Sequence, residues 1–207
     1  RRRDSSVMPK NEITKAALSE GIKEIMKEKK LSQITIKDIT EKCGVSRNAF
    51  YYHFRDKYDL INWIFSTETF PIINTFSDPD KYLDGFVCIC KYMLNNKSFY
   101  MEVFDYVGQN SLADYLIESY FELMKLHIMT VYSNIGYHLA DDELYILAKM
   151  QAYAYVGIII EWVRGGMKEN YMIYFEKLKN LKASLTIPLS CYEMLIRKLP
   201  DNKQKNL

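Results

Sequence analysis

Residues 44–60 read GVSRNAFYYHFRDKYDL, and this stretch decides how the N-terminal part of the chain is expected to fold. Gly44 stands where a tight turn would require positive φ without a Cβ clash. Ser46 can cap a short helix after the turn, and Asp56 can cap the helix that follows. Two short helices joined by a glycine turn, the second exposing Arg, Asn and tyrosine side chains, are typical of a helix-turn-helix.

The residues before this stretch predict two more helices. Apolar side chains recur on one face over residues 10–29. Thr35 is a good N-cap for a second, short helix, and the Asp38 carboxylate three residues later suits a helix N-terminus. Ile34 and Ile39 hold the positions of a hydrophobic staple, which fixes the direction in which the chain enters the helix.

The rest of the chain also predicts helices. Its 207 residues include only five prolines and eight glycines, too few for the frequent turns of an all-β fold, and apolar residues recur with a period near 3.6. We therefore predict an all-α fold in which an N-terminal three-helix helix-turn-helix domain joins a larger C-terminal helical domain. The expected divisions are a basic arm or leader at 1–9, the helix-turn-helix domain at 10–66, the helical body at 67–199 and a flexible tail at 200–207. Within the body, helices are expected near 80–95, 97–107, 110–134, 142–165 and 170–186, with a short one after Pro188.

Charge is distributed unevenly along the chain. Residues 1–66 hold 14 Lys and Arg against 9 Asp and Glu, whereas the remaining residues hold 14 against 17. A basic N-terminal third on an acidic body fits a protein that contacts a polyanion with one end. Double-stranded DNA is the expected partner.

Other classes of site find little support. On a helix Cys88 and Cys90 point to different faces, which favours packing over a metal or redox site, and His127 and His138 lack metal-ligand spacing. Neither a glycine-rich phosphate loop nor a nucleophile elbow is present, so no cofactor and no enzymatic activity are expected. The longest apolar run, at 152–160, is too short to span a membrane, and with no secretory signal a cytoplasmic location is expected.

The short helix after Ser46 carries the predicted DNA contacts. Phe50 and Phe54, four residues apart, should pack inwards, while Arg47 and Asn48 suit bidentate contacts with guanine and adenine edges. Hydroxyls and ammonium groups around this helix suit phosphate oxygens. The predicted DNA-binding residues are Thr35, Lys37, Ser46, Arg47, Asn48, Ala49, Tyr51, Tyr52, His53 and Lys57.

Residues 13–65 resemble the DNA-binding domain of the TetR family of bacterial transcriptional regulators. The likeness rests on Gly44, Val45, Ser46, Tyr51, His53, Phe54, Lys57 and Leu60. The sequence of residues 43–54 most resembles that of one subgroup, the regulators related to the activator of dihydroxyacetone-kinase operons. Segments 96–100, 108–111 and 162–167 carry a looser likeness in the body. Thr40 stands where the family often has alanine, and Lys29-Lys30 where it often has glycine.

The resemblance implies a homodimer on a pseudo-palindromic operator, with one recognition helix in each half-site. It implies base contacts from Lys37, Arg47, Asn48, Ala49 and Tyr52, and phosphate contacts from Thr35, Tyr51, His53 and Lys57. It also implies that the body encloses a pocket for a small-molecule effector and that its last large helices form the dimer contact.

The body is rich in aromatic residues and methionine, which suit either a core or an adaptable apolar pocket. The pocket candidates are Phe86, Met93, Phe104, Tyr120, Met124, Tyr153 and Trp162. A helix that is apolar all round must be covered on both sides, which predicts a dimer contact at Tyr155, Gly157, Ile159 and Ile160. Glu161 could bind a partner arginine, line a pocket or lie exposed. The alternatives are a body that responds to a protein co-regulator without a small-molecule pocket and, less favoured, an enzyme.

Overall fold

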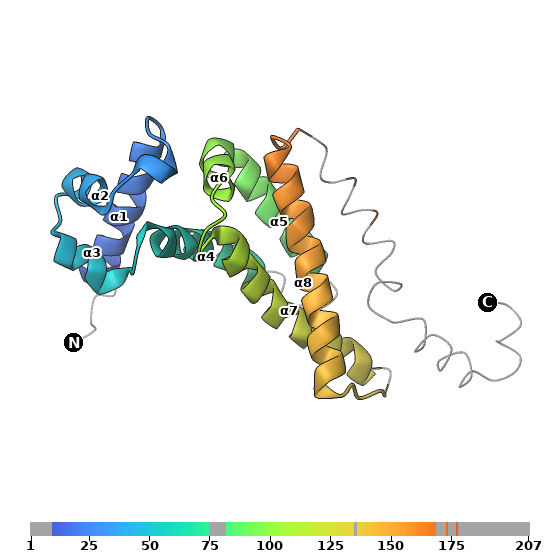
Figure 1. Cartoon of the computed structure of the whole chain (residues 1–207). Coiled ribbons are helices and arrows are strands. Elements are labelled where there is room, and N and C mark those ends of the chain that lie inside the picture. The colour runs from blue at the N-terminus through green and yellow to red at the C-terminus, as the bar shows by residue number, and fades with distance from the viewer. Residues whose placement is uncertain (1–9, 75–81, 135, 169–172, 174–176, 178–207) are drawn as a thin grey trace, which may run out of the picture.

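The computed structural model describes residues 10–74, 82–134, 136–168, 173 and 177, and over these the chain is all-helical, as predicted (Figure 1). The N-terminal domain begins with α1 (Lys10–Met26) and a short 3₁₀ turn, η1 (Leu31–Gln33), followed by α2 (Ile36–Cys43) and α3 (Arg47–His53). The long helix α4 (Lys57–Asn74) leads away from it. The body contains α5 (Tyr82–Asn95), α6 (Lys97–Phe104), α7 (Leu112–Asn134) and α8 (Asp141–Arg164).

All three predicted helix caps in the N-terminal domain are present. The Thr35 hydroxyl accepts a hydrogen bond from the Asp38 N–H at 3.1 Å, and the Asp38 carboxylate accepts one from the Thr35 N–H at 2.7 Å. Ser46 Oγ accepts from the Ala49 N–H at 3.1 Å, and Asp56 Oδ1 accepts from two backbone N–H groups at the start of α4. These bonds satisfy donors that have no partner inside a helix, so each cap fixes where its helix begins.

Two glycines set the geometry of α2. Gly44 ends this helix in the left-handed conformation, with φ at 65°, as the turn before α3 was predicted to require. Gly21 lies where α1 and α2 approach closely, and a Cβ built there would lie 2.2 Å from Cys43 Sγ. The Cys43 thiol in turn donates to the Ala17 carbonyl of α1 at 3.2 Å. A bare backbone at Gly21 therefore allows the two helices to meet.

The core of the N-terminal domain lies between α1, α2, α3 and the start of α4. Phe50 and Phe54 are 0% and 3% exposed, which confirms that they form the inward face of α3. The staple residues Ile34 and Ile39 are also buried. The side chains packed with them are Leu18, Ile22, Leu31, Leu60 and Ile61.

The helix α4 connects the two parts of the molecule. It continues past Pro71 to Asn74, and the predicted division between residues 66 and 67 falls inside it.

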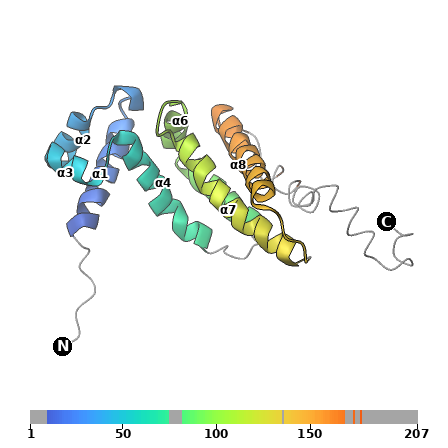
Figure 2. The same cartoon turned by 60° about the horizontal axis from the view of Figure 1, so that its bottom comes forward.

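In the body, α7 and α8 pack along each other as an antiparallel pair (Figures 1 and 2). Gly165 and Gly166 end α8 as predicted, and Gly166 adopts φ of 79°. The helices predicted at 170–186 and after Pro188, the leader at 1–9 and the tail at 200–207 lie outside the described residues.

Within the described part of the chain, α8 is the one helix long and apolar enough, by length and composition alone, to cross a membrane. It packs against α7, and 33% of its most apolar segment is buried inside the chain. Two-thirds of that segment is therefore not buried by the chain, so α8 has an apolar side that is left uncovered.

Candidate nucleic-acid interface and ligand cavity

The helix α3 lies at the end of the molecule remote from α8 (Figure 1), and its outer face presents polar and aromatic side chains. Arg47 and Asn48 are exposed, and Tyr51 and Tyr52 are 57% and 81% exposed. Ala49 is half-buried and leaves room for close approach to this face. Since Phe50 and Phe54 hold the opposite face in the core, the side chains predicted to read bases are fixed on a rigid support and directed outwards.

The start of α2 adds a second polar surface beside α3. Thr35 and Lys37 are exposed there, and Lys37 Nζ lies 3.6 Å from the Glu41 carboxylate on the same helix. Free N–H groups and the helix dipole favour an anion at such a terminus. His53, at the end of α3, is half-buried and packs edge-on against the Tyr52 ring at 4.9 Å.

The half-buried Lys57 directs its ammonium group to backbone carbonyls of the N-terminal domain. Nζ donates to the Leu31 and Ile34 carbonyls at 2.6 and 2.7 Å, and lies 3.4 Å from the Ser32 carbonyl. Partial burial and the nearby Lys29 lower the pKa of Lys57. In this structure Lys57 ties the start of α4 to the connection between α1 and α2. The phosphate contact expected of it from sequence stays a prediction.

Asp38 holds the other side of this connection. Its carboxylate accepts from Lys29 Nζ at 2.9 Å as well as from the Thr35 hydroxyl and N–H. These hydrogen bonds, the one from Lys29 first, hold the pKa of Asp38 well below its usual range. The loop that leads into α2 is therefore fixed by one carboxylate and one ammonium group.

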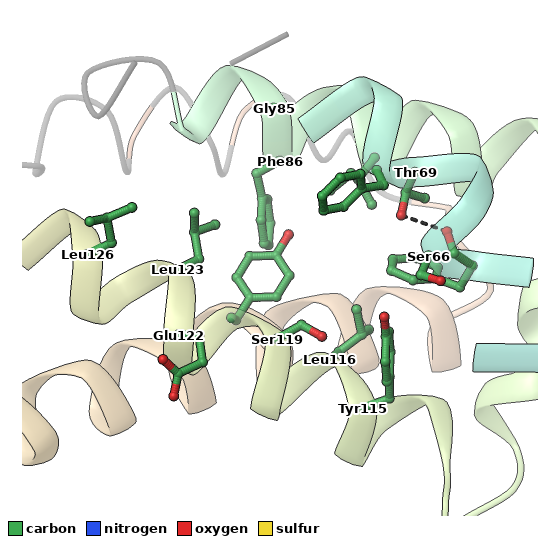
Figure 3. A pocket seen from close by; sticks show the side chains of 14 residues that line it. Ser66, Thr69, Gly85, Phe86, Tyr115, Leu116, Ser119, Glu122, Leu123 and Leu126 are labelled. Atoms are coloured by element: carbon green, nitrogen blue, oxygen red, sulfur yellow. Dashed lines mark hydrogen bonds between the residues drawn. The ribbon is translucent and has the colours of Figure 1, made fainter. Parts of the chain in front are cut away.

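An apolar cavity of about 360 Å³ lies in the body between α4, α5 and α7 (Figure 3). Phe86 and Tyr120 meet edge to face in its wall, with ring centroids 5.3 Å apart. The hydroxyls of Ser66 and Thr69 donate to carbonyls of their own helix, at 3.0 and 2.7 Å, so towards the cavity they can only accept. Its lining residues are Phe65, Ser66, Thr69, Phe70, Gly85, Phe86, Ile89, Tyr115, Leu116, Ser119, Tyr120, Glu122, Leu123 and Leu126.

Two of the seven predicted pocket residues, Phe86 and Tyr120, line this cavity. The other five do not line this cavity. Met93, Phe104 and Met124 are core residues no more than 2% exposed, and Trp162 is also buried, whereas Tyr153 is 52% exposed on the outer side of α8. The α4 residues that form one wall were missed because helical periodicity marks them only as apolar or small.

The predicted dimer residues divide between two faces of α8. Tyr155 and Ile159 are 5% and 1% exposed, and the Tyr155 ring packs against that of Phe86 with centroids 5.5 Å apart, so these two side chains are buried within the chain. Gly157 and Glu161 are exposed, and Ile160 is half-buried. The outward apolar side chains lie earlier on the helix, at Tyr145, Ile146, Met150 and Tyr153.

Cys88 and Cys90 are side chains packed within the body. Cys90 is buried, which raises the pKa of its thiol to about 12, and Cys88 is half-buried. Among the described residues no group of three or more His, Cys, Asp or Glu side chains is placed to hold a metal ion.

Three contacts that sequence reasoning did not identify join the body to the N-terminal domain. Glu102 of α6 accepts from the Leu31 N–H at 2.8 Å. After α6, the ring of Tyr106 stacks on that of Tyr58 in α4, with centroids 3.7 Å apart. Asn110 Nδ2 then donates to the N-cap carboxylate of α4. All three partners lie on α6 or directly after it, so this segment links the body to the base of the N-terminal domain.

Comparisons with known proteins agree with this architecture. Residues 18–64 match the family model of bacterial regulatory proteins of the tetR family, and residues 80–183 match that of a transcriptional regulator C-terminal region. The HTH-type dhaKLM operon transcriptional activator DhaS of Lactococcus lactis subsp. lactis (strain IL1403) is 25% identical over 181 residues, which is 87% of this chain and 95% of that protein.

Solved structures show the same fold. The dihydroxyacetone kinase operon activator DhaS superposes with a TM-score of 0.57 at 24% identity, covering 84% of this chain and 94% of its own. The fatty acid degradation regulator FadR from Bacillus halodurans superposes with a TM-score of 0.55 at 16% identity, covering 89% and 98%. Both family models fall on the two parts that the structure divides at α4, and the chain belongs to the TetR family of bacterial transcriptional regulators, which bind DNA through the N-terminal helix-turn-helix.

Proposed function

We propose that the chain acts in the cytoplasm as a homodimer on a palindromic operator and that a small molecule in the α4–α5–α7 cavity tunes its affinity for DNA. The observation that carries the DNA-reading part is the outer face of α3. There Arg47 and Asn48 stand exposed on a helix whose other face is locked into the core by Phe50. Arginine pairs bidentately with guanine and asparagine with adenine in the major groove.

The dimer part rests on the outer side of α8. Ile146, Met150 and Tyr153 are 56%, 64% and 52% exposed, and their spacing of four and three residues, continued by Gly157, puts them in one stripe. A stripe of this kind is normally covered in a soluble protein. A second copy of the chain, meeting it through the same stripe, would also place two α3 helices on one DNA duplex.

The effector part rests on the cavity and its walls. It is an apolar hollow of the size that small-molecule sites have, and α4 forms one of its walls. The first half of α4 packs in the core of the N-terminal domain, so a change in the position of α4 would move α3 with it. A ligand that binds better to one position of α4 would therefore change the separation of the two α3 helices in the dimer.

The DNA-reading part is tested with an operator selected from random duplexes by the wild-type protein. Arg47→Ala should bind it about 5- to 150-fold more weakly, corresponding to about 1–3 kcal/mol, and should lose preference at one base position. Arg164→Ala, which removes an exposed arginine at the far end of α8, should bind like the wild type. Equal affinity of wild type and Arg47→Ala in a mobility-shift assay would remove α3 as the reading helix.

The dimer part is tested by sedimentation. Met150→Asp should shift the chain from dimer to monomer at micromolar concentration, because it places a charge in the centre of the stripe. A variant that remains dimeric would place the dimer contact on another face.

A further inference from the structure

A second hollow borders the apolar cavity. This hollow of about 630 Å³ lies between the first half of α4 and the start of α7, and Ser66 and Tyr115 line both spaces. Figure 3 shows these two side chains together at one end of the apolar cavity, with Leu123 and Leu126 towards the other. One elongated molecule could therefore extend from the apolar cavity past Ser66 and Tyr115 into the second hollow, which we name the junction cleft.

The lining of the junction cleft differs from that of the cavity in charge. Its charged residues are one arginine, Arg55, and three carboxylates, Asp59, Asp114 and Glu118. Arg55 is largely exposed and lies 4.0 Å from Asp59, so the two nearly balance each other. Glu118 is exposed and forms no ion pair among the described residues. The cleft thus offers net negative charge, which attracts a cation and repels an anion.

The neutral polar groups of the cleft include a hydrogen-bond acceptor that has no donor among the described residues. Asn62 donates from Nδ2 to the Asn110 carbonyl at 3.1 Å, while its Oδ1 is buried and accepts no hydrogen bond from any described residue. A buried acceptor without a donor is rare, because it loses its hydrogen bond to water without replacement. A hydroxyl or ammonium group near Asn62 would supply that donor.

From these features we infer that the effector is an amphiphile, with an apolar chain or ring in the α4–α5–α7 cavity and a hydroxylated or cationic head in the junction cleft. This inference rests on the proposed effector function of the cavity. Anionic amphiphiles are disfavoured, because neither hollow has a lysine in its lining and the single arginine is paired with Asp59. The head also lies at the place where Asn62 and Asn110 join α4 to the α6–α7 loop, so its arrival changes contacts at the base of the N-terminal domain.

Three probes with the same ten-carbon chain separate the head chemistries: decyltrimethylammonium, 1-decanoylglycerol and decanoate. Binding to the full chain is measured by calorimetry below the micellar concentration and at low ionic strength. The ammonium and glycerol compounds should bind, and decanoate should bind at least about tenfold more weakly than the ammonium, because its head meets like charge. Decanoate binding as tightly as the ammonium would overturn the inference.

Two charge reversals on α7 locate the head. Glu118→Lys should weaken decyltrimethylammonium about three- to tenfold and leave the glyceride unchanged. Glu122→Lys reverses a carboxylate one turn further along, which lines the apolar cavity and not the junction cleft and lies 3.4 Å from Lys125 Nζ; it should weaken decyltrimethylammonium less than Glu118→Lys does. A larger effect from Glu122→Lys than from Glu118→Lys would place the head at the other end and overturn the assignment of the junction cleft.

A third variant tests the chain site. Ser119→Trp on α7 should fill the cavity and abolish binding of all three probes, with the helical circular dichroism spectrum unchanged. If the wild type binds none of the probes, the ligand class is wrong. The selected operator is then measured in the same preparation: retained DNA binding leaves the regulator function standing and removes only this inference, whereas loss of both would remove the proposed function as well.

Discussion

Asn110, in the loop between α6 and α7, donates a hydrogen bond from Nδ2 to Oδ2 of Asp56 at 3.0 Å. The other oxygen of Asp56 accepts from the N–H groups of Tyr58 and Asp59, both at 2.8 Å, as the N-cap of α4. One carboxylate therefore holds the start of α4 and binds the body at the same time. The N-cap of α4 is therefore also a contact between the α6–α7 loop and the N-terminal domain.

Replacing Asn110 with alanine should weaken this joint without disturbing the cap. The variant loses one part-buried hydrogen bond to a charged acceptor, which corresponds to about 1.5–3 kcal/mol of unfolding free energy. Alanine at the backbone φ of 62° found at Asn110 adds strain of about 1–2 kcal/mol to this loss. We expect a lower midpoint in urea and a broader transition, since the N-terminal domain and the body then unfold less cooperatively. Gln109→Ala, at the exposed neighbouring position, should match the wild type in both respects.

The anchoring role of Lys57 is separable from a phosphate contact by salt dependence. Lys57→Met removes a donor shared by buried carbonyls, so we expect a loss of about 1–3 kcal/mol of stability. Operator affinity should fall because α2 and α3 are displaced, but the slope of log affinity against log salt should stay at the wild-type value. Loss of a true phosphate contact would instead reduce that slope by about 0.9. A reduced slope for Lys57→Met would support the phosphate contact that the sequence predicted for Lys57.

Asp38 predicts a defined response to acid. Because its pKa is lowered in the folded chain, the stability it contributes is fully present above the unfolded value of about 3.9 and is lost as pH falls towards the folded pKa. Urea unfolding at pH 7 and at pH 3 should show a smaller difference for Asp38→Asn than for the wild type. Glu28→Gln removes an exposed carboxylate of the same domain that forms no ion pair among the described residues, and it should keep the wild-type difference.

Local chemistry explains which parts of this structure could be predicted from sequence. Caps and turns depend on residues two to four positions apart. Thr35, Ser46 and Gly44 therefore sufficed to predict where α2 and α3 begin and where α2 ends. The outward face of α3 followed from the spacing of Phe50 and Phe54.

Long-range contacts could not be predicted in this way. The carbonyls that hold Lys57 lie 23 to 26 residues away, and the partner of Asp56 lies 54 residues away. The pocket residues of the body were harder to predict than these contacts, because aromatic residues and methionine fill a core and line a cavity equally well. Only the packing of α4 against α5 and α7 placed Phe86 at the cavity and Met93 in the core.

The contact between α1 and α2 provides the last prediction. Alanine at Gly21 gains about 1 kcal/mol in helix propensity, but its Cβ would lie 2.2 Å from Cys43 Sγ. Overpacking of this kind costs about 1–3 kcal/mol, so Gly21→Ala should be destabilised on balance and should shift α2 together with α3, weakening operator binding. Cys43→Ala alone should cost less, because it removes only the weak thiol hydrogen bond to Ala17 and some packing.

The double variant Gly21→Ala, Cys43→Ala removes the clash and keeps the gain in helix propensity. It should therefore be more stable than Gly21→Ala alone, with a coupling of about 1 kcal/mol or more in a double-mutant cycle measured by urea unfolding. Strictly additive effects would mean that the thiol moves aside at no cost. In that case the absence of a side chain at Gly21 would not be what lets α1 and α2 approach.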